Sequence, residues 1–176
     1  LIASGLSYVM LHFDAPRATR EQLLGAHDAG YVDEVFAASP QQGFAWLDGD
    51  TAMCPFTLEA ALHAAGAAVH GVDLVMQKQV NHVFCPVRPP GHHAMRVVHG
   101  ACGFCDINIE AIMIEYLRQA YPITKVAIVD TDCHHGDGTQ DIYWHDPNTL
   151  FISIHQDGRT LYPGSGFPNE QGGPNA

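Results

Sequence analysis

Three continuous apolar runs constrain the fold of this chain more strongly than any other feature. The runs HVFCPV, KVAIVD and TLFISIH lie at residues 82–87, 125–130 and 149–155. Short runs without polar alternation are typical of strands that are buried on both faces of a parallel sheet. Because helical segments separate them, we expect βαβ units and a three-layer α/β/α fold with a central, mainly parallel sheet.

The segments between and before these runs are predicted to be helices. Apolar residues recur at helical spacing in four of them, at 18–27, 29–39, 57–77 and 106–121. Thr57 opens the third segment and Asp106 opens the fourth, so we expect these two side chains to cap the helices. The helices would supply the layers that cover the sheet.

Composition limits the partners that such a domain can have. Hydrophobic residues make up 47% of the 176 positions, enough for one domain with a real core. A net charge of −11 argues against direct nucleic-acid binding and suits cationic ligands better. No run reaches the ~20 apolar residues of a membrane span, and the apolar start lacks the basic region of a signal peptide. We expect a cytoplasmic protein without a membrane partner, whose five cysteines are reduced.

Histidine and aspartate gather just after each predicted strand, where parallel sheets place their ligand sites. Tandem histidines, His92 and His93, follow the first run behind a stiff Arg-Pro-Pro-Gly loop. The second run ends in DTDCHHGDG at 130–138, and the third in HQDGRTLYPGSG at 155–166. Packing does not account for this density of ionisable side chains, so we expect a functional site at this edge of the sheet.

The motif after the second run has the spacing of a metal site. Asp132 and His134 are two residues apart, and alternate side chains of an extended backbone share one face. A carboxylate with a neutral imidazole suits Zn²⁺ or another first-row divalent ion. We therefore expect these two side chains to be metal ligands.

The tandem histidines fit acid–base chemistry. Adjacent residues on a rigid loop cannot both point the same way, so His92 and His93 each need a partner of their own. A catalytic histidine usually has its second ring nitrogen held by a carboxylate. Asp130 and Asp137 are the candidates.

Four blocks of the chain, in this order, resemble the histone deacetylase and acetylpolyamine amidohydrolase family, with closest likeness to class II and bacterial members. The blocks are RPPGHHA at 88–94, GFCDIN at 103–108, VDTDCHHGDGTQDIYW at 129–144 and SIHQDGRTLYPGSG at 153–166. The segments 18–36 and 50–62 also match its N-terminal half. The resemblance implies the arginase–deacetylase fold and zinc-dependent hydrolysis of an acetyl-lysine or acetylpolyamine to acetate and free amine.

The resemblance also implies a role for each matching residue. His93 would be the general base and His92 its electrostatic neighbour, paired with Asp137 and Asp130 respectively. Zinc would be bound by Asp132 and His134. The acyl-amine tunnel would be lined by Gly103, Phe104 and Tyr162. A potassium site would use the backbone carbonyls of Asp130, Asp132 and His134, with Ser153 and Ile154.

Two parts of the family pattern are not found before Ala176, namely a third zinc ligand (an aspartate) and the tyrosine or histidine that stabilises the oxyanion. We therefore expect residues 1–176 to form a partial catalytic domain, an N-terminal portion that belongs to a larger body or a homo-oligomer. Asp157 is a substitute ligand to consider. The alternative function is a non-catalytic acyl-amine-binding or scaffold protein.

Two other site types compete with this interpretation. Cys102 and Cys105 have CxxC spacing just before a predicted helix. Together with Cys133 or a histidine they could form a structural zinc site or a redox pair, although one such pair is a weak signal. Ureohydrolases of the arginase type use an Asp-x-His-x-Asp run for two manganese ions. Here two residues, not one, separate His134 from Asp137, which disfavours that class.

Overall fold

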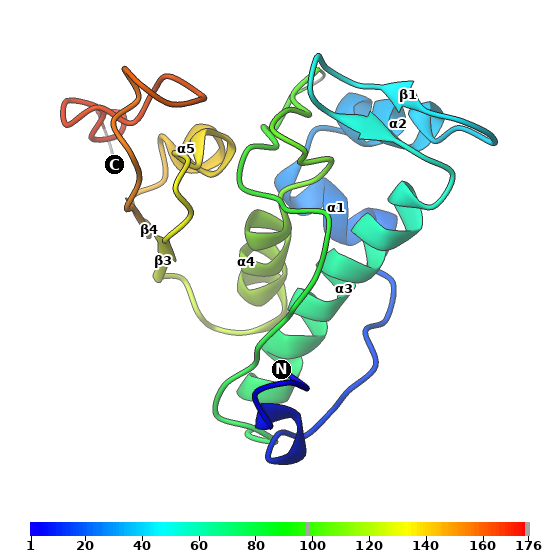
Figure 1. The fold of residues 1–176 in the computed structure, drawn as a ribbon. Helices are drawn as coiled ribbons and strands as arrows, with labels where there is room; N and C mark the ends of the chain where they lie inside the picture. The colour runs from blue at the N-terminus through cyan, green and yellow to red at the C-terminus, as the bar shows by residue number, and fades with distance from the viewer. Residues whose placement is uncertain (98, 175–176) are drawn as a thin grey trace.

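A computed structural model describes residues 1–97 and 99–174, in which helices precede and flank a small parallel sheet (Figure 1). A 3₁₀ turn, η1, covers Leu6–Tyr8. The α-helices are α1 Arg20–Ala26, α2 Ala29–Ala38, α3 Thr57–Met76, α4 Ile109–Ala120 and α5 Asp137–Tyr143. The strands are β1 Ala45–Trp46, β2 Ala52–Met53, β3 Val126–Asp130 and β4 Thr149–Ser153. The four predicted helices and two of the three predicted strands are confirmed.

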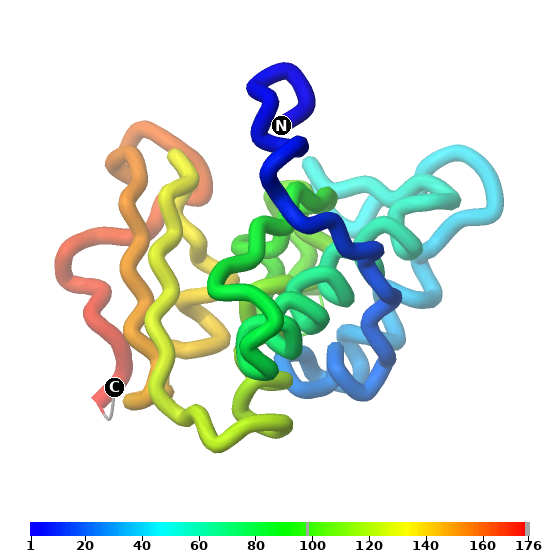
Figure 2. The backbone as a smooth tube through the Cα atoms, turned by 90° about the horizontal axis from the view of Figure 1, so that it is seen from below, coloured from blue at the N-terminus to red at the C-terminus, as the bar shows by residue number. Residues whose placement is uncertain are grey.

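The parallel sheet consists of β3 and β4, which run side by side in Figure 2. Val126 lies opposite Thr149 at one end of the register and Asp130 lies opposite Ser153 at the other. The predicted strand at 82–87 is wrong, because this segment has no ladder partner among the described residues. The Val87 N–H donates to the Cys85 carbonyl instead, which is a local turn bond. Apolar sequence makes a strand only where a neighbouring strand can accept its backbone hydrogen bonds.

Two predicted helix caps are also corrected. Phe56 is the N-cap of α3, and Thr57 is its first helical residue, with a hydroxyl that accepts the Cys54 N–H at 2.9 Å. In α4 the cap is Asn108 rather than Asp106, and its side-chain oxygen accepts the Ala111 N–H at 3.0 Å. The Asn108 amide also donates to two buried acceptors, which a carboxylate cannot do.

The hydrophobic core lies where α3 and α1 pack against α4. Its largest fully buried side chains include Tyr31, Leu23, Leu62 and Ile112. The inner face of β3, with Val126 and Ile128, packs against this cluster. On the outer face Val129 and Leu150 are 58% and 60% exposed, so the described residues form a helical layer on one face of the sheet only. No described helix has the length and apolar character to cross a membrane.

His27, at the end of α1, joins the core to the loop that carries the tandem histidines. Its Nδ1 donates to the Met95 carbonyl at 2.8 Å, and its Nε2 accepts the Asn108 N–H at 2.9 Å. Burial lowers the pKa of His27 to about 4, so the ring is neutral at pH 7. This neutral ring fixes the spacing between the start of α4 and the 92–95 loop.

Gly66 provides a test of the packing of α3. A Cβ at this position would lie 1.9 Å from the Pro16 carbonyl oxygen and 2.8 Å from the Ala18 nitrogen, both backbone atoms. We expect Gly66→Ala to lower the free energy of unfolding by about 1–3 kcal/mol, since the segment 16–18 must shift. Gly49→Ala, where nothing lies within 4 Å, is the control. Equal urea midpoints for the two variants would contradict this packing.

His27 predicts a specific pH dependence of stability. The unfolded ring titrates near 6.5 and the folded ring near 4, so only the unfolded state gains a proton between these values. His27 therefore contributes stability that is present above pH 6.5 and is lost as the pH falls toward 4, on the order of 3 kcal/mol. We expect denaturant unfolding of His27→Gln to have a shallower pH slope in this window. The exposed control His82→Gln should have the same pH slope as the wild-type protein. A wild-type slope in His27→Gln would refute the role of His27 in this pH dependence.

Candidate active site

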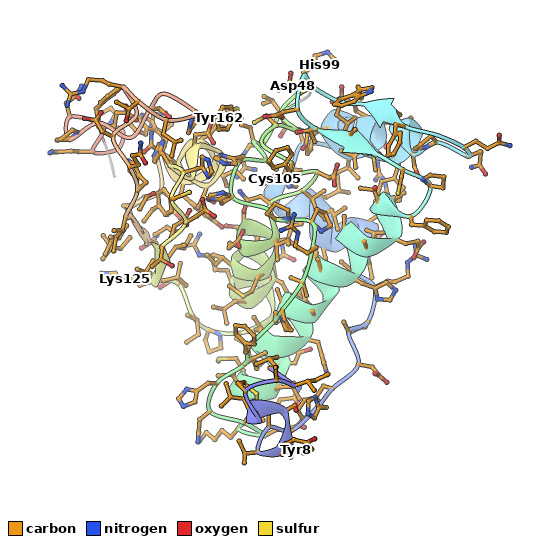
Figure 3. All side chains as sticks on the ribbon, viewed as in Figure 1. Tyr8, Asp48, His99, Cys105, Lys125 and Tyr162 are labelled. Carbon is orange, nitrogen blue, oxygen red and sulfur yellow. The ribbon has the colours of Figure 1, made fainter. Side chains whose placement is uncertain are left out.

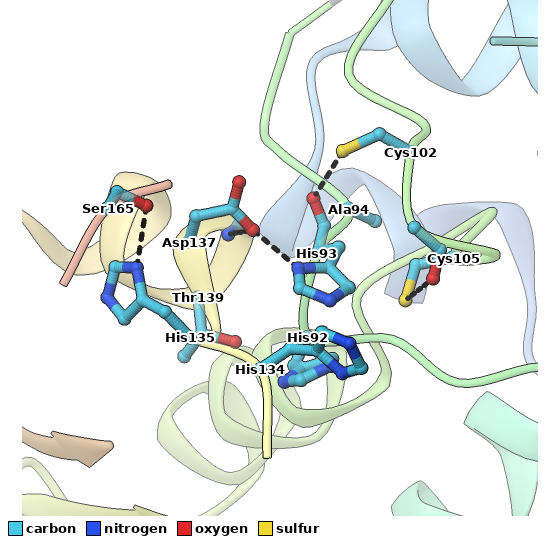
Figure 4. A network of polar contacts seen from close by, with 12 residues as sticks. His92, His93, Ala94, Cys102, Cys105, His134, His135, Asp137, Thr139 and Ser165 are labelled. Atoms are coloured by element: carbon cyan, nitrogen blue, oxygen red, sulfur yellow. Dashed lines mark hydrogen bonds and ion pairs between the residues drawn. The ribbon is translucent and has the colours of Figure 1, made fainter. Parts of the chain in front are cut away.

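The structure brings each tandem histidine to one aspartate, and Figure 4 shows the pair formed by His93 and Asp137. The Nδ1 of His92 lies 2.7 Å from Oδ2 of Asp130, and the Nδ1 of His93 lies 2.6 Å from Oδ1 of Asp137. The two imidazole rings are 4.0 Å apart, and the His93 residue is 3% exposed. Because an ionised aspartate only accepts hydrogen bonds, Nδ1 of each ring carries the proton and Nε2 of His93 is available as a base.

The backbone around these pairs is packed too closely for side chains at two glycines. A Cβ at Gly91 would lie 2.6 Å from the Ile109 nitrogen, and a Cβ at Gly138 would lie 2.4 Å from the His93 carbonyl carbon. The Thr139 N–H donates to the His92 carbonyl at 3.1 Å. The histidine loop is therefore held between the N-termini of α4 and α5.

Asp132 and His134 converge beside the histidine pairs. Oδ1 of Asp132 lies 2.9 Å from Nδ1 of His134 and also accepts the His134 backbone N–H at 2.8 Å. The Cys133 thiol lies 3.4 Å from the same Nδ1, so one donor atom from each of the three residues falls within 4.8 Å of the others. A carboxylate, a thiol and an imidazole at this spacing have the donor chemistry of a Zn²⁺ site. The sequence suggested Cys133 as a ligand only together with the CxxC pair, whereas the structure places it beside Asp132 and His134.

The predicted tunnel residues lie around His93. The Tyr162 ring stands edge-on to the His93 ring, with centroids 5.1 Å apart. Figure 3 shows Tyr162 on the C-terminal segment and Cys105 on the segment that precedes α4. Gly103 and Phe104 form the centre of a turn, with φ of 57° and 67°, that closes with a Cys105 N–H to Cys102 carbonyl bond. A Cβ at Gly103 would lie 2.3 Å from Cδ2 of His93, so the turn rests against the histidine ring.

Asp50 and Thr51 hold this turn, and sequence reasoning missed both. Oδ1 of Asp50 accepts the Gly103 N–H at 2.9 Å, and the Thr51 hydroxyl accepts the Phe104 N–H at 3.0 Å. They lie in the loop of the β1–β2 hairpin, more than fifty residues from the turn. An Asp-Thr pair in a polar loop indicates hydrogen bonds from backbone N–H groups to its side chains. It does not indicate which segment of the chain supplies those N–H groups.

The electrostatics of the site favour ion pairing. Burial opposes the charged form of His92, but the hydrogen bond and charge of Asp130 outweigh burial and raise the pKa of this histidine. Burial likewise opposes the Asp130 carboxylate, but the His92 hydrogen bond outweighs it and lowers the pKa of the aspartate. The pKa of Asp132 is lowered against burial by hydrogen bonds from His134. The two shifts have a common cause, since the hydrogen bond between His92 and Asp130 favours the charged form of both groups.

The remaining predicted positions are those of the potassium site and the substitute zinc ligand. At the strand ends, the Ile154 N–H donates to the Asp130 carbonyl at 2.9 Å, and the Ser153 hydroxyl contacts Nδ1 of His155 at 2.8 Å. Asp157 is ion-paired with Arg159 and lies outside the donor cluster.

The described structure also bears on the CxxC alternative. The Cys102 thiol contacts the His93 carbonyl, and the buried Cys105 thiol contacts the Gly103 carbonyl. Neither belongs to a group of metal-ligating side chains among the described residues. Burial raises the pKa of both thiols, which disfavours the reactive thiolate that a redox pair needs.

Comparisons with known proteins agree with this geometry. The family described as "Histone deacetylase domain" matches residues 1–176. The chain is 40% identical over 157 residues to a "Probable deacetylase" of Archaeoglobus fulgidus, covering 89% of this chain and 42% of that protein. It is 37% identical to a "Histone deacetylase-like amidohydrolase" of Pseudomonas aeruginosa, covering 90% and 41%. The solved structure titled "Crystal Structure of HDA15 HD domain" superposes with a TM-score of 0.89 at 34% identity, covering 99% of this chain and 52% of that one.

The chain thus spans about half, or somewhat less, of the length of the proteins that it matches. The structural match confirms the predicted α/β class with its parallel sheet. The family match covers every residue on which the site is built. By sequence and by fold, this chain belongs to the histone deacetylase family.

Proposed function

We propose that the protein hydrolyses the amide bond of an acetylated amine in a zinc-dependent reaction, giving acetate and a free amine. The observation that carries the proposal is the arrangement of two His–Asp pairs, 2.7 and 2.6 Å long, beside the Asp132–His134 donor pair. Relatives named as deacetylases and as an amidohydrolase support the reaction class. The substrate would be an acetyl-lysine or an acetylated polyamine, which suits the acidic chain.

Asp132 and His134 would bind the zinc ion. Their donor atoms already share one hydrogen bond, so a cation can replace the proton between them without a change of backbone. Zinc, when bound, polarises the acyl carbonyl and makes a water molecule more acidic. A potassium ion would be bound by the carbonyls of Asp130, Asp132 and His134 with Ser153 and Ile154.

His93 would act as the general base. Asp137 holds its Nδ1–H, which fixes the tautomer and leaves Nε2 free to take a proton from the attacking water. Since the residue is 3% exposed, bulk water does not compete for this nitrogen.

His92 would supply positive charge beside His93. Its ring lies 4.0 Å from that of His93, and the hydrogen bond and charge of Asp130 favour its charged form by raising its pKa. An imidazolium at this place stabilises negative charge that develops on the carbonyl oxygen and can return a proton to the departing amine.

Phe104 and Tyr162 would flank the methylene chain of the acyl-amine, with Gly103 allowing close approach.

Five free thiols are consistent with a cytoplasmic protein. The exposed apolar face of the β3–β4 sheet supports association with a larger body or with a second copy.

Zinc binding tests the metal assignment. We expect Asp132→Asn and His134→Ala each to weaken zinc affinity at least about tenfold, because each removes a donor atom. Asp157→Asn is the matched control, since this carboxylate pairs with Arg159 outside the cluster. The measurement is competition with a chromogenic chelator at pH 7.5. Equal loss in the control and in the ligand variants would contradict the site.

Hydrolysis of an acetyl-lysine fluorogenic substrate and of N-acetylputrescine tests the base. We expect His93→Ala to lower kcat by about 10²–10⁴, since the proton of the attacking water then has no acceptor. The exposed His82→Ala should leave kcat unchanged. A zinc-loaded protein that binds these compounds without hydrolysing them would overturn the enzyme assignment in favour of a binding or scaffold protein.

A further inference from the structure

A second pocket opens beside the candidate active site, on the far side of the turn that carries Gly103 and Phe104. Its volume is about 420 Å³, and it lies between the β1–β2 hairpin, the first turn of α3 and the Arg88–Pro89 segment. Gly103 faces the His93 ring, whereas the next residue, Phe104, lines this pocket. The turn is thus a shared wall between the two sites.

One residue that lines this pocket, Asp106, has an unpartnered carboxylate oxygen. Asp106 is 2% exposed, and its Oδ1 is buried without a hydrogen-bond partner. Its backbone carbonyl accepts the Tyr31 hydroxyl, but neither side-chain oxygen is bonded to any residue in the described ranges. A buried acceptor without a donor is unfavourable unless something outside the chain supplies one.

The walls of the pocket have the chemistry of a cation site. Trp46 and Phe104 line it and are 68% and 62% exposed, so their aromatic surfaces are accessible to a ligand. Cations bind favourably against such rings, and Asp50 adds a second carboxylate at the same pocket. Arg88 lies at the rim, is exposed, and forms no ion pair with the described residues. It neutralises part of the negative charge without bonding to Asp106.

We propose that this pocket binds a primary ammonium group on a slender alkyl chain, with Asp106 as its anion and Trp46 and Phe104 as its aromatic walls. An alkyl chain is narrow enough to approach a carboxylate that is only 2% exposed, and an ammonium supplies a hydrogen-bond donor to it. The consequence for catalysis rests on the proposed function: a preferred substrate carries a free amine in addition to the acetylated one. Both a polyamine and a peptide with a neighbouring lysine have this chemistry.

The binding test uses n-pentylammonium chloride, with 1-pentanol as the neutral probe of similar shape. Burial raises the pKa of Asp106 to about 6, so the titration is made at pH 8, where the carboxyl is ionised. The NMR shifts of the Trp46 indole N–H and of the Trp46 and Phe104 backbone amides are followed in the 176-residue chain. We expect saturable shifts with the ammonium and none with the alcohol. The probe has no acyl group and needs no zinc, so its result is independent of whether the protein hydrolyses amides.

Three variants test the roles of the charged side chains: one is expected to weaken binding of the ammonium probe, one to strengthen it, and one is a control. Asp106→Asn should weaken binding about tenfold through loss of a charge-assisted hydrogen bond. Arg88→Gln should strengthen binding about twofold, because a repelling rim charge is removed. Asp48→Asn removes a carboxylate that is exposed on the same hairpin but does not line the pocket, and should change affinity less than twofold. Equal effects of Asp106→Asn and Asp48→Asn would reduce the site to general electrostatics and overturn it.

A second variant covers the case that Asp106→Asn does not fold. Ala60 lines the pocket from an exposed position of α3, where a longer side chain is tolerated. Ala60→Lys places an ammonium in the pocket and should weaken probe binding about tenfold; unchanged affinity overturns the proposal. Spermidine and a short peptide with one free lysine, titrated in parallel, distinguish the two sources of the ligand by their affinities. Loss of amide hydrolysis with retained ammonium binding would overturn the proposed function but not this site.

Discussion

The buried side chain of Asn108 is the contact on which the arrangement of the site depends. Its oxygen caps α4 at Ala111, while its amide donates to the Ala94 carbonyl and to the Thr139 hydroxyl, both at 3.1 Å. One side chain therefore links a helix start, the end of the histidine loop and α5. Only an amide offers donors and an acceptor together, so an aspartate at this position would leave the Ala94 carbonyl unpaired. His27, which accepts the Asn108 N–H, extends the same network to α1.

This network explains how two adjacent histidines are directed to different hydrogen-bond partners. His92 and His93 are adjacent in sequence, yet each meets a different aspartate, one at the end of β3 and one at the start of α5. The carboxylates come from elements that the sheet and the Thr139 contacts hold fixed. Because the ring centroids are 4.0 Å apart, a charge on one ring acts directly on the other.

The sequence was sufficient for features that depend on local pattern. The strands at 126–130 and 149–153 and the convergence of Asp132 with His134 follow from apolar runs and alternate spacing. The run at 82–87 has the same character but no strand partner within residues 1–97 and 99–174, and nothing within the run shows this. Likewise, Asp106 and Asn108 are both capable caps, and only the tertiary acceptors of the amide decide between them. The contacts of Asp50 and Thr51 with the Phe104 turn join residues about fifty positions apart, beyond any local pattern.

Aspartates near the site differ in environment, and the difference separates their roles. Asp130 and Asp132 are surrounded by donors, and the pKa of each is lowered although burial alone would raise it. Asp106 is the most buried of the three, and with no donor its pKa is raised. The Asp106 carboxylate does not cap the helix that follows, since Asn108 is the N-cap of α4. An unpaired buried carboxylate oxygen is unfavourable for the fold, and the proposed ammonium ligand would offset this cost beside the aromatic side chains of Trp46 and Phe104.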